Sequence, residues 1–320
     1  MLAKTVKISV IVCTYNRCES LAKALNSVAD QTLPESAAWE VLVVDNNSKD
    51  DTRKVVESFR CEWPGRFRYI FEPQQGKSHA LNAGIRAAQG VILAFVDDDV
   101  MVDPMWLQNL TAHIGTDGSQ GAGGRIVPDR TFSAPRWLAV AGRYALAPLA
   151  MFDLGNEARD LTEPPFGTNM AFRKTMFEKY GGFRTDLGPR PGSEIRNEDT
   201  EFGWRLLASG ERLRYEPSAV VYHAIPESRV RKKYFLAWWF DKARADVRQF
   251  GIPADVNRFC GIPLHLFRRI GVGTMRWMGA VEPSRRFSCK IKVWAMAGEI
   301  LECYRQSRDA KAESECPMRI

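Results

Sequence analysis

The feature that most constrains the fold of this chain is a regular alternation of short apolar runs and amphipathic segments over residues 7–125. The runs KISVIVC and EVLVVD are rich in β-branched residues, which is typical of strands buried on both faces of a parallel sheet. Between them, residues 17–31 carry apolar side chains at helical spacing, and Pro34 predicts the end of that helix. Strands that alternate with helices predict a doubly wound α/β sheet with right-handed crossovers.

Further elements follow along the chain, and after Arg125 a long segment rich in Pro and Gly predicts loops with short helices. The predicted strands lie at 67–72, 91–99 and 165–172, the helices at 48–59, 78–89, 173–183 and 200–210, and a hairpin-like return at 212–223. Beyond Ile225 the pattern predicts helix to about residue 310. We therefore expect a large domain over residues 1–225 and a helical region over residues 226–320.

Composition narrows the class of protein. Of the 320 residues, 45% are hydrophobic and 26% are charged, as in soluble globular proteins. The net charge of +7 leaves open a mildly basic protein, an anionic substrate or an anionic membrane surface; nucleic acid is disfavoured because no basic run accompanies a nucleic-acid-binding module. Seven cysteines without a CxxC pair predict a reducing, cytoplasmic location. No apolar stretch is long enough for a transmembrane helix.

Three polar clusters follow predicted strands, and they are TYNR, DNNS and DDD. In a doubly wound sheet, ligands bind beyond the carboxyl ends of the strands, so the three clusters should converge on one crevice. The acidic run Asp97-Asp98-Asp99 is the sharpest signal, since adjacent carboxylates repel one another unless a cation compensates them. A divalent ion such as Mg²⁺ or Mn²⁺, shared with substrate phosphates, is the natural partner. The alternative is a solvated acidic turn.

Three further sites carry weaker signals. Asp45 follows a predicted strand where a nucleoside would lie, although Asp-Asn-Asn is also a common turn. Lys77 lies between Gly76 and Ser78 at a predicted helix start, which suits an anion, but the full phosphate-loop pattern is absent, so ATPase chemistry is disfavoured. The Glu198–Asp199 pair begins another predicted helix, where a carboxylate is either a cap or a functional group.

Six blocks of this sequence resemble family 2 glycosyltransferases in content and order: ISVIVCTYNR, VLVVDNNSKDDT, GKSHALNAGI, FVDDDVMVDP, GTNMAFRKTMFEKYGGF and EDTEFGWRL. The resemblance covers about Lys7 to His223. It implies the GT-A fold, which is a Rossmann-like, mostly parallel sheet flanked by helices. It also implies a nucleotide-diphosphate-sugar donor, a divalent metal and inversion at the anomeric carbon. Residues 1–125 would form the nucleotide-binding half and residues 126–225 the acceptor-binding half.

The resemblance also implies roles for individual residues. Those matching the nucleotide-binding positions are Thr14, Tyr15, Asn16, Asp45, Lys77 and Asp97. Asp45 matches the carboxylate that reads the base, usually uracil. Asp99 matches a metal ligand, Asp97 the other carboxylate of the DxD pair, and His223 a position where some relatives have a third ligand; for His223 a structural role stays open. Asp199 matches the catalytic base, with Glu198 near the acceptor.

The sequence departs from the family pattern at two places. Leu81 stands where many relatives have an arginine that contacts the nucleotide. The QxxRW signature of processive synthases is absent, because Gly273 stands where glutamine would be required. The resemblance therefore implies single sugar additions, in polysaccharide or glycolipid synthesis. Nucleotidyl transfer and a non-catalytic nucleotide-sugar-binding protein are the alternatives.

The region after Ile225 lies outside the resemblance and mixes basic with aromatic residues. Trp238 and Trp239 follow the basic run RVRKK, and Trp277 and Trp294 lie among further Arg and Lys residues. Such a mixture suits a membrane interface, whereas core packing of the tryptophans is the alternative. At an interface, the protein would be peripheral on the inner face of the plasma membrane, and its acceptor would be lipid-linked or membrane-proximal.

Overall fold

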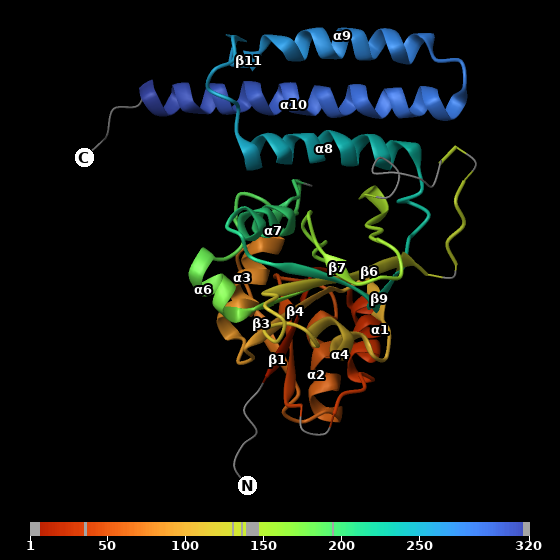
Figure 1. The fold of residues 1–320 in the computed structure, drawn as a ribbon, viewed down its shortest axis with the longest axis vertical. Coiled ribbons are helices and arrows are strands. Elements are labelled where there is room, and N and C mark those ends of the chain that lie inside the picture. The colour runs from red at the N-terminus through yellow and green to blue at the C-terminus, as the bar shows by residue number, and fades with distance from the viewer. Residues whose placement is uncertain are drawn as a thin grey trace. The chain divides into compact units, whose positions relative to one another are not determined.

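A nine-stranded sheet organises the first part of the chain (Figure 1). The computed structural model describes residues 7–34, 37–129, 131–135, 137–138, 147–193 and 195–315, with the side chains of residues 310–315 left out. The strands are β1 (Ile8–Thr14), β2 (Trp39–Asp45), β3 (Phe67–Phe71), β4 (Ile92–Asp97), β5 (Val100–Val102), β6 (Gly121–Pro128), β7 (Arg159–Asp160), β8 (Asn169–Arg173) and β9 (Leu213–His223). Their order is β3-β2-β1-β4-β8-β6-β9-β5, with β7 on β9.

The sheet is mixed, with most strands parallel. β1 pairs in parallel with β2 and β4, and β2 with β3. β8 runs antiparallel to both β4 and β6, so β6 shares the direction of β4, as does its parallel neighbour β9. β5 and β7 are antiparallel to β9. The predicted α/β sheet is confirmed.

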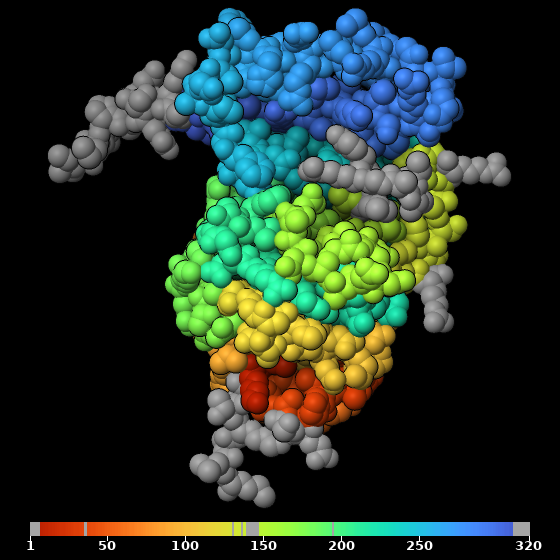
Figure 2. All heavy atoms as spheres, viewed as in Figure 1, coloured from red at the N-terminus to blue at the C-terminus, as the bar shows by residue number. Residues whose placement is uncertain are grey.

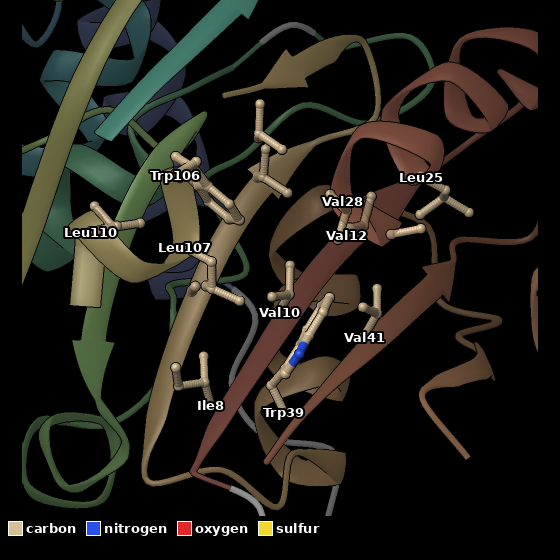
Figure 3. Packing of buried hydrophobic residues seen from close by; sticks show 14 of the residues in the cluster. Ile8, Val10, Val12, Leu25, Val28, Trp39, Val41, Trp106, Leu107 and Leu110 are labelled. Carbon is tan, nitrogen blue, oxygen red and sulfur yellow. The ribbon is translucent and has the colours of Figure 1, made fainter. Parts of the chain in front are cut away.

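Two apolar layers cover the two faces of this sheet, because successive residues of a strand point to opposite sides. Val10 and Val12 pack with α1 (Cys18–Ala29), α2 (Thr52–Glu62) and α4 (Trp106–Thr111), and Figure 3 shows this layer. Ile11 packs on the other face with α3 (Lys77–Ala87), α6 (Lys174–Tyr180) and α7 (Glu198–Ala208). Each fully buried Val, Leu or Ile contributes roughly 1.5–3 kcal/mol, so these layers fix the positions of the strand ends.

The predicted hairpin-like return at 212–223 is wrong, because these residues form the single strand β9. The register with β6 shifts within it: Glu216 lies opposite Gly124, but Val220 lies opposite Arg125. Pro217 falls in this irregularity, where its missing N–H removes no bond from the ladder. A proline that suggests a turn in the sequence is thus absorbed as a β-bulge.

The chain divides into two compact units. The first unit comprises residues 1–132, 150–192 and 198–225, and the second comprises residues 133–149, 193–197 and 226–320. The elements of the second unit are the 3₁₀ helix η1 (Ala147–Leu149), α8 (Lys232–Phe250), β10 (Arg258–Phe259), β11 (Ile262–Pro263), α9 (Leu264–Gly279) and α10 (Pro283–Glu315). The predicted helical region is therefore interrupted by a small antiparallel strand pair.

Helix α10 is the centre of the second unit and packs against both α8 and α9. The space-filling view in Figure 2 shows the atoms of α9 and α10 in contact. At Gly298 the α10 backbone approaches the Phe240 carbonyl of α8 so closely that a Cβ would overlap it. The buried Glu302 carboxylate accepts hydrogen bonds from Arg244 and Arg248 of α8. Among the described residues, no helix is both long and apolar enough to cross a membrane.

The tryptophans of the second unit take part in this packing. Trp238 and Trp239 are buried and meet edge to face with their ring centroids 4.9 Å apart. Trp277 of α9 meets Trp294 of α10 in the same geometry at 5.9 Å. The Lys290 ammonium lies 5.3 Å and 4.9 Å from the Trp277 and Trp294 rings. Core packing therefore accounts for Trp238 and Trp239, whereas Trp277 and Trp294 remain partly exposed.

Candidate functional site

The polar clusters of the first unit meet at the carboxyl edge of the sheet. Thr14 ends β1 directly opposite Asp45, which ends β2. Cys13 lies opposite Asp97, which ends β4. Because β8 runs antiparallel to β4 and begins at Asn169, opposite Val96, the two residues before it are brought to this same edge. The convergence expected of a doubly wound sheet is present.

Asp97 is tied to a lysine and a threonine. Its Oδ1 lies 2.7 Å from the Lys77 Nζ, and its Oδ2 accepts a 2.7 Å hydrogen bond from the Thr168 hydroxyl. The Glu198 Oε1 lies 3.8 Å from the same ammonium. Burial disfavours charge, but the Asp97 and Glu198 carboxylates outweigh it and raise the pKa of Lys77 above its usual value. Burial is likewise outweighed by the Lys77 ammonium, which lowers the pKa of Asp97.

Asp98 and Asp99 share one arginine. Arg17 Nη1 donates to the Asp98 Oδ1 at 2.9 Å and to the Asp99 Oδ2 at 3.0 Å. The Thr14 hydroxyl donates to the Asp98 Oδ2 at 2.7 Å. Burial raises the pKa of Asp98 to about 6, even though Arg17 opposes the shift. Arg17 and Lys77 together therefore supply the positive charge that the three adjacent carboxylates require.

His223 lies beside Asp99 for a reason of strand register. β5 starts immediately after the acidic run, and its first residue, Val100, pairs with His223 at the end of β9. The His223 Nε2 is 3.8 Å from the Asp99 Oδ1. The His223 side chain is 2% exposed and that of Asp99 is 18% exposed, so the carboxylate is the more accessible of the two.

Asp45 is buried, and both of its carboxylate oxygens accept hydrogen bonds. The Ser48 N–H donates to Oδ1 at 2.9 Å, and the Tyr69 hydroxyl donates to Oδ2 at 2.7 Å. Burial and this carboxylate raise the pKa of Tyr69 to about 12. A carboxylate accepts about four hydrogen bonds, so Asp45 retains capacity for a ligand N–H or O–H.

The loop after β1 is fastened to the loop after β2. The Asn16 N–H donates to the Ser48 Oγ at 2.9 Å, and the Asn16 Oδ1 accepts a 2.7 Å hydrogen bond from the Lys49 N–H. Asn16 has φ of 51°, a left-handed conformation that asparagine tolerates better than most residues. Tyr15 remains 37% exposed. The loop thus has a fixed backbone and an accessible aromatic side chain.

Glu198 and Asp199 begin α7 and differ in exposure. Glu198 is 4% exposed, whereas Asp199 is partly exposed. The Asp199 Oδ2 accepts a 2.6 Å hydrogen bond from the Gly167 N–H, and its Oδ1 accepts one from the Thr200 N–H at 2.7 Å. A Cβ on Gly167 would lie 2.9 Å from the Asp199 Oδ2, too close for an unstrained contact. Gly167 and Thr168 are adjacent, so one short segment binds both Asp199 and Asp97.

Four residues at this edge were given no individual role from the sequence: Arg17, Gly167, Thr168 and Asp98, which was named only as part of the acidic run. Each lies inside a block that carried the family resemblance, in TYNR, DDD or GTNM. Their position inside these blocks was the only indication in the sequence that they belong to the site. The partners of these residues lie up to 84 residues away along the chain, as with Asp98 and Thr14, so only the fold shows what they bind.

Residues 9–181, more than half of the chain, match the family model described as Glycosyl transferase family 2. The chain belongs to this family. Over 236 residues it is 30% identical to the succinoglycan biosynthesis protein ExoM of Rhizobium meliloti, covering 73% of this chain and 71% of that one. It is 31% identical over 229 residues to the glycosyltransferase AglE of Haloferax volcanii, with 71% and 70% covered. Membership favours glycosyl transfer over the nucleotidyl-transfer and non-catalytic alternatives.

Solved structures support the fold of this family 2 glycosyltransferase. The mannosyltransferase PcManGT from Pyrobaculum calidifontis, in complex with GDP-Man and Mn²⁺, aligns with a TM-score of 0.57 at 21% identity, covering 99% of this chain and 77% of that chain. Staphylococcus aureus TarS 1-349 in complex with UDP aligns with a TM-score of 0.52 at 18% identity, covering 98% and 93%. The expected GT-A fold is confirmed.

The residues at the sheet edge fit a divalent cation. Asp99 and His223 offer an oxygen and a nitrogen 3.8 Å apart, and the Arg17 guanidinium lies 3.0 Å from the other Asp99 oxygen. Over the described ranges, no group of three or more His, Cys, Asp and Glu side chains is placed to hold a metal ion. Such a site suits Mg²⁺ or Mn²⁺, which proteins commonly hold through one or two carboxylates with substrate phosphates as further ligands.

Proposed function

We propose that this glycosyltransferase moves a sugar from a nucleoside-diphosphate donor, a UDP-sugar, to an acceptor hydroxyl, with inversion at the anomeric carbon. The observation that carries the proposal is the 167–168 segment, which binds Asp199 through Gly167 and Asp97 through Thr168. It holds a candidate base and a candidate donor-binding carboxylate at one sheet edge. Since ExoM is named for succinoglycan biosynthesis, polysaccharide or glycolipid synthesis is the proposed setting.

The donor nucleotide is assigned to the first three strand ends. The residues proposed to bind it are Thr14, Tyr15, Asn16, Asp45, Lys77 and Asp97. Asp45 would accept a hydrogen bond from the base, since its position is fixed by Ser48 and Tyr69 while lone pairs remain. Tyr15 offers an exposed ring against which a base can stack. Lys77, at a helix start, carries a charge suited to the diphosphate.

Asp99 and His223 are the residues proposed to hold Mn²⁺ or Mg²⁺, with Asp97 as the second carboxylate of the DxD pair. When bound, the cation would stabilise the charge that develops on the departing diphosphate. Arg17 would then have to release Asp99 or share it, because both cations draw on the same carboxylate.

Asp199 is the proposed general base. The acceptor oxygen forms a bond to the anomeric carbon as the bond from that carbon to the diphosphate oxygen breaks, and the hydroxyl proton passes to the Asp199 carboxylate. Attack from the face opposite the diphosphate inverts the anomeric centre. Gly167 and Thr200 orient the carboxylate through their N–H groups. Glu198, buried near Lys77, is proposed to position the acceptor side of the site.

A panel of nucleotide sugars tests the proposal. With Mn²⁺ present, UDP-sugars should raise the melting temperature, because a ligand that binds only the folded state stabilises it. The matched UDP-sugar should also be consumed with release of UDP when a sugar acceptor is added, and chelation of the metal should stop both effects. If only GDP-sugars raise the melting temperature, the base of the donor is guanine and the assignment of uracil is wrong. No protection by any nucleotide sugar would overturn the proposal.

A further inference from the structure

Helix α9 has two apolar faces, of which only one is packed. On the inner face Leu266 is fully buried and Trp277 meets Trp294 of α10. Gly273 lies so close to Met296 of α10 that a Cβ would press on the methionine side chain. This inner face accounts for the attachment of α9 to the second unit.

The outer face exposes large apolar side chains. Leu264 is 50% exposed, Phe267 41%, Met275 62% and Met278 65%. With the exposed Gly271 between them, these positions follow steps of three and four residues, so they form one stripe along the helix. Leaving such side chains in water forgoes the gain from burying them, and a contiguous exposed patch of this kind marks an interaction surface.

The charged side chains of α9 itself have a single sign, and one of them, Arg269, pairs with Glu299 of α10 at 3.5 Å. Over the 24 residues from Arg258 to Val281 there are four arginines and neither Asp nor Glu. Arg268, Arg269 and Arg276 lie on α9 itself and are exposed. Arg268 follows the stripe residue Leu264 by four positions, so it lies at the edge of the stripe. The surface therefore pairs an apolar strip with a basic flank.

We propose that the outer face of α9, defined by Leu264, Phe267, Met275, Met278 and the flanking arginines, docks on an anionic lipid bilayer. Apolar side chains beside Arg residues match the boundary between acyl chains and anionic headgroups. A second copy of the chain is the poorer occupant, because a two-fold contact through this face would bring the arginines of both copies together. The inference needs neither donor nor acceptor and is independent of the proposed reaction.

Co-sedimentation with vesicles tests the docking. The full chain should pellet with vesicles of equal parts phosphatidylcholine and phosphatidylglycerol, should remain in solution with pure phosphatidylcholine, and should be released by salt. Met278→Gln should weaken partitioning about tenfold, and Arg276→Gln about fivefold. The double variant Phe267→Gln/Met278→Gln should reduce binding further. These side chains are exposed, so melting temperatures should match that of the wild type.

Matched controls lie in the first unit. The exposed fraction of Val91, 61%, is similar to the 65% of Met278, so Val91→Gln removes a comparably exposed apolar side chain. Arg86→Gln removes one positive charge from an arginine whose side chain is 69% exposed. Both controls should bind vesicles like the wild type. Absent binding, equal binding to both vesicle types, or equal losses in controls and α9 variants would overturn the proposal. A concentration-dependent dimer abolished by Met278→Gln, without vesicle binding, would assign the face to a second copy instead.

Discussion

The two units differ in where they place side chains that lower stability when they lack a partner, namely clustered carboxylates and exposed apolar groups. The first unit brings carboxylates together at one sheet edge and compensates them from within, Asp97 by Lys77 and Asp99 by Arg17. The second unit buries the Glu302 carboxylate and the side chains of Trp238 and Trp239, yet leaves the outer-face side chains of α9 from Leu264 to Met278 in water. In each unit the unusual placement is the basis of our proposal for what the unit binds, a cation with an anionic substrate in the first and a lipid surface in the second. Substitutions should therefore impair one activity and spare the other.

The largest difference between the effects on sugar transfer and on vesicle binding is expected from Asp199→Asn. The amide keeps the size of the carboxylate but cannot take the acceptor proton, so turnover should fall by roughly two to four orders of magnitude. Donor affinity, measured by calorimetry with UDP-sugar and Mn²⁺, should stay near that of the wild type, and vesicle binding should be unchanged. A variant that retains more than about a tenth of wild-type turnover would remove Asp199 from the mechanism, and Glu198 would be tested next.

Asp99→Ala should abolish metal-dependent donor binding, with a loss of about a hundredfold or more in UDP affinity in the presence of Mn²⁺. Asp97→Ala should weaken donor binding less completely, because Lys77 and Thr168 already engage both of its oxygens. Calorimetry with and without Mn²⁺ separates the two variants. If the affinity of Asp99→Ala for UDP shows the same Mn²⁺ dependence as the wild type, the assigned metal ligand is wrong.

His223→Ala distinguishes between two roles of this histidine, that of a metal ligand and that of a structural residue. A ligand role predicts that Mn²⁺ affinity and turnover fall together, by about tenfold. The side chain is 2% exposed, so a purely structural role predicts a lower melting temperature with unchanged metal dependence of activity. The exposed His113, replaced by Ala, controls for nonspecific Mn²⁺ binding by imidazole.

Much of the first unit followed from the sequence because two rules act together there. The period of the apolar residues identifies strands and helices, and the parallel arrangement brings Thr14, Asp45 and Asp97 to one edge. The single strand β9 did not follow, because the sequence does not show that a bulge absorbs Pro217. Nor did the outer face of α9: both of its faces are apolar, and only packing on α10 shows which one is buried.

The smallest effect, and one of opposite sign, is expected at Arg17. Its guanidinium donates to the Asp99 Oδ2 at 3.0 Å and so competes with a cation for that carboxylate. Arg17→Met should therefore strengthen Mn²⁺ binding in the absence of nucleotide. Nearly half of the Arg17 side chain is exposed, with 47% of its surface accessible, so solvent screens the competition. The gain should be about 1 kcal/mol, or about fivefold in affinity.

Calorimetric titration with Mn²⁺ alone measures this gain, and Arg60→Met is the matched control. Arg60 is equally exposed, at 47%, and pairs with Glu57 on α2. The Arg17 variant should also melt at a lower temperature without metal, because Asp98 stays buried without its arginine, and Mn²⁺ should restore part of the loss. Unchanged or weaker Mn²⁺ binding would show that Arg17 does not compete with the cation. A loss of UDP affinity alone would assign the guanidinium to the diphosphate, and the charge balance of the first unit would then depend on the nucleotide as much as on the metal.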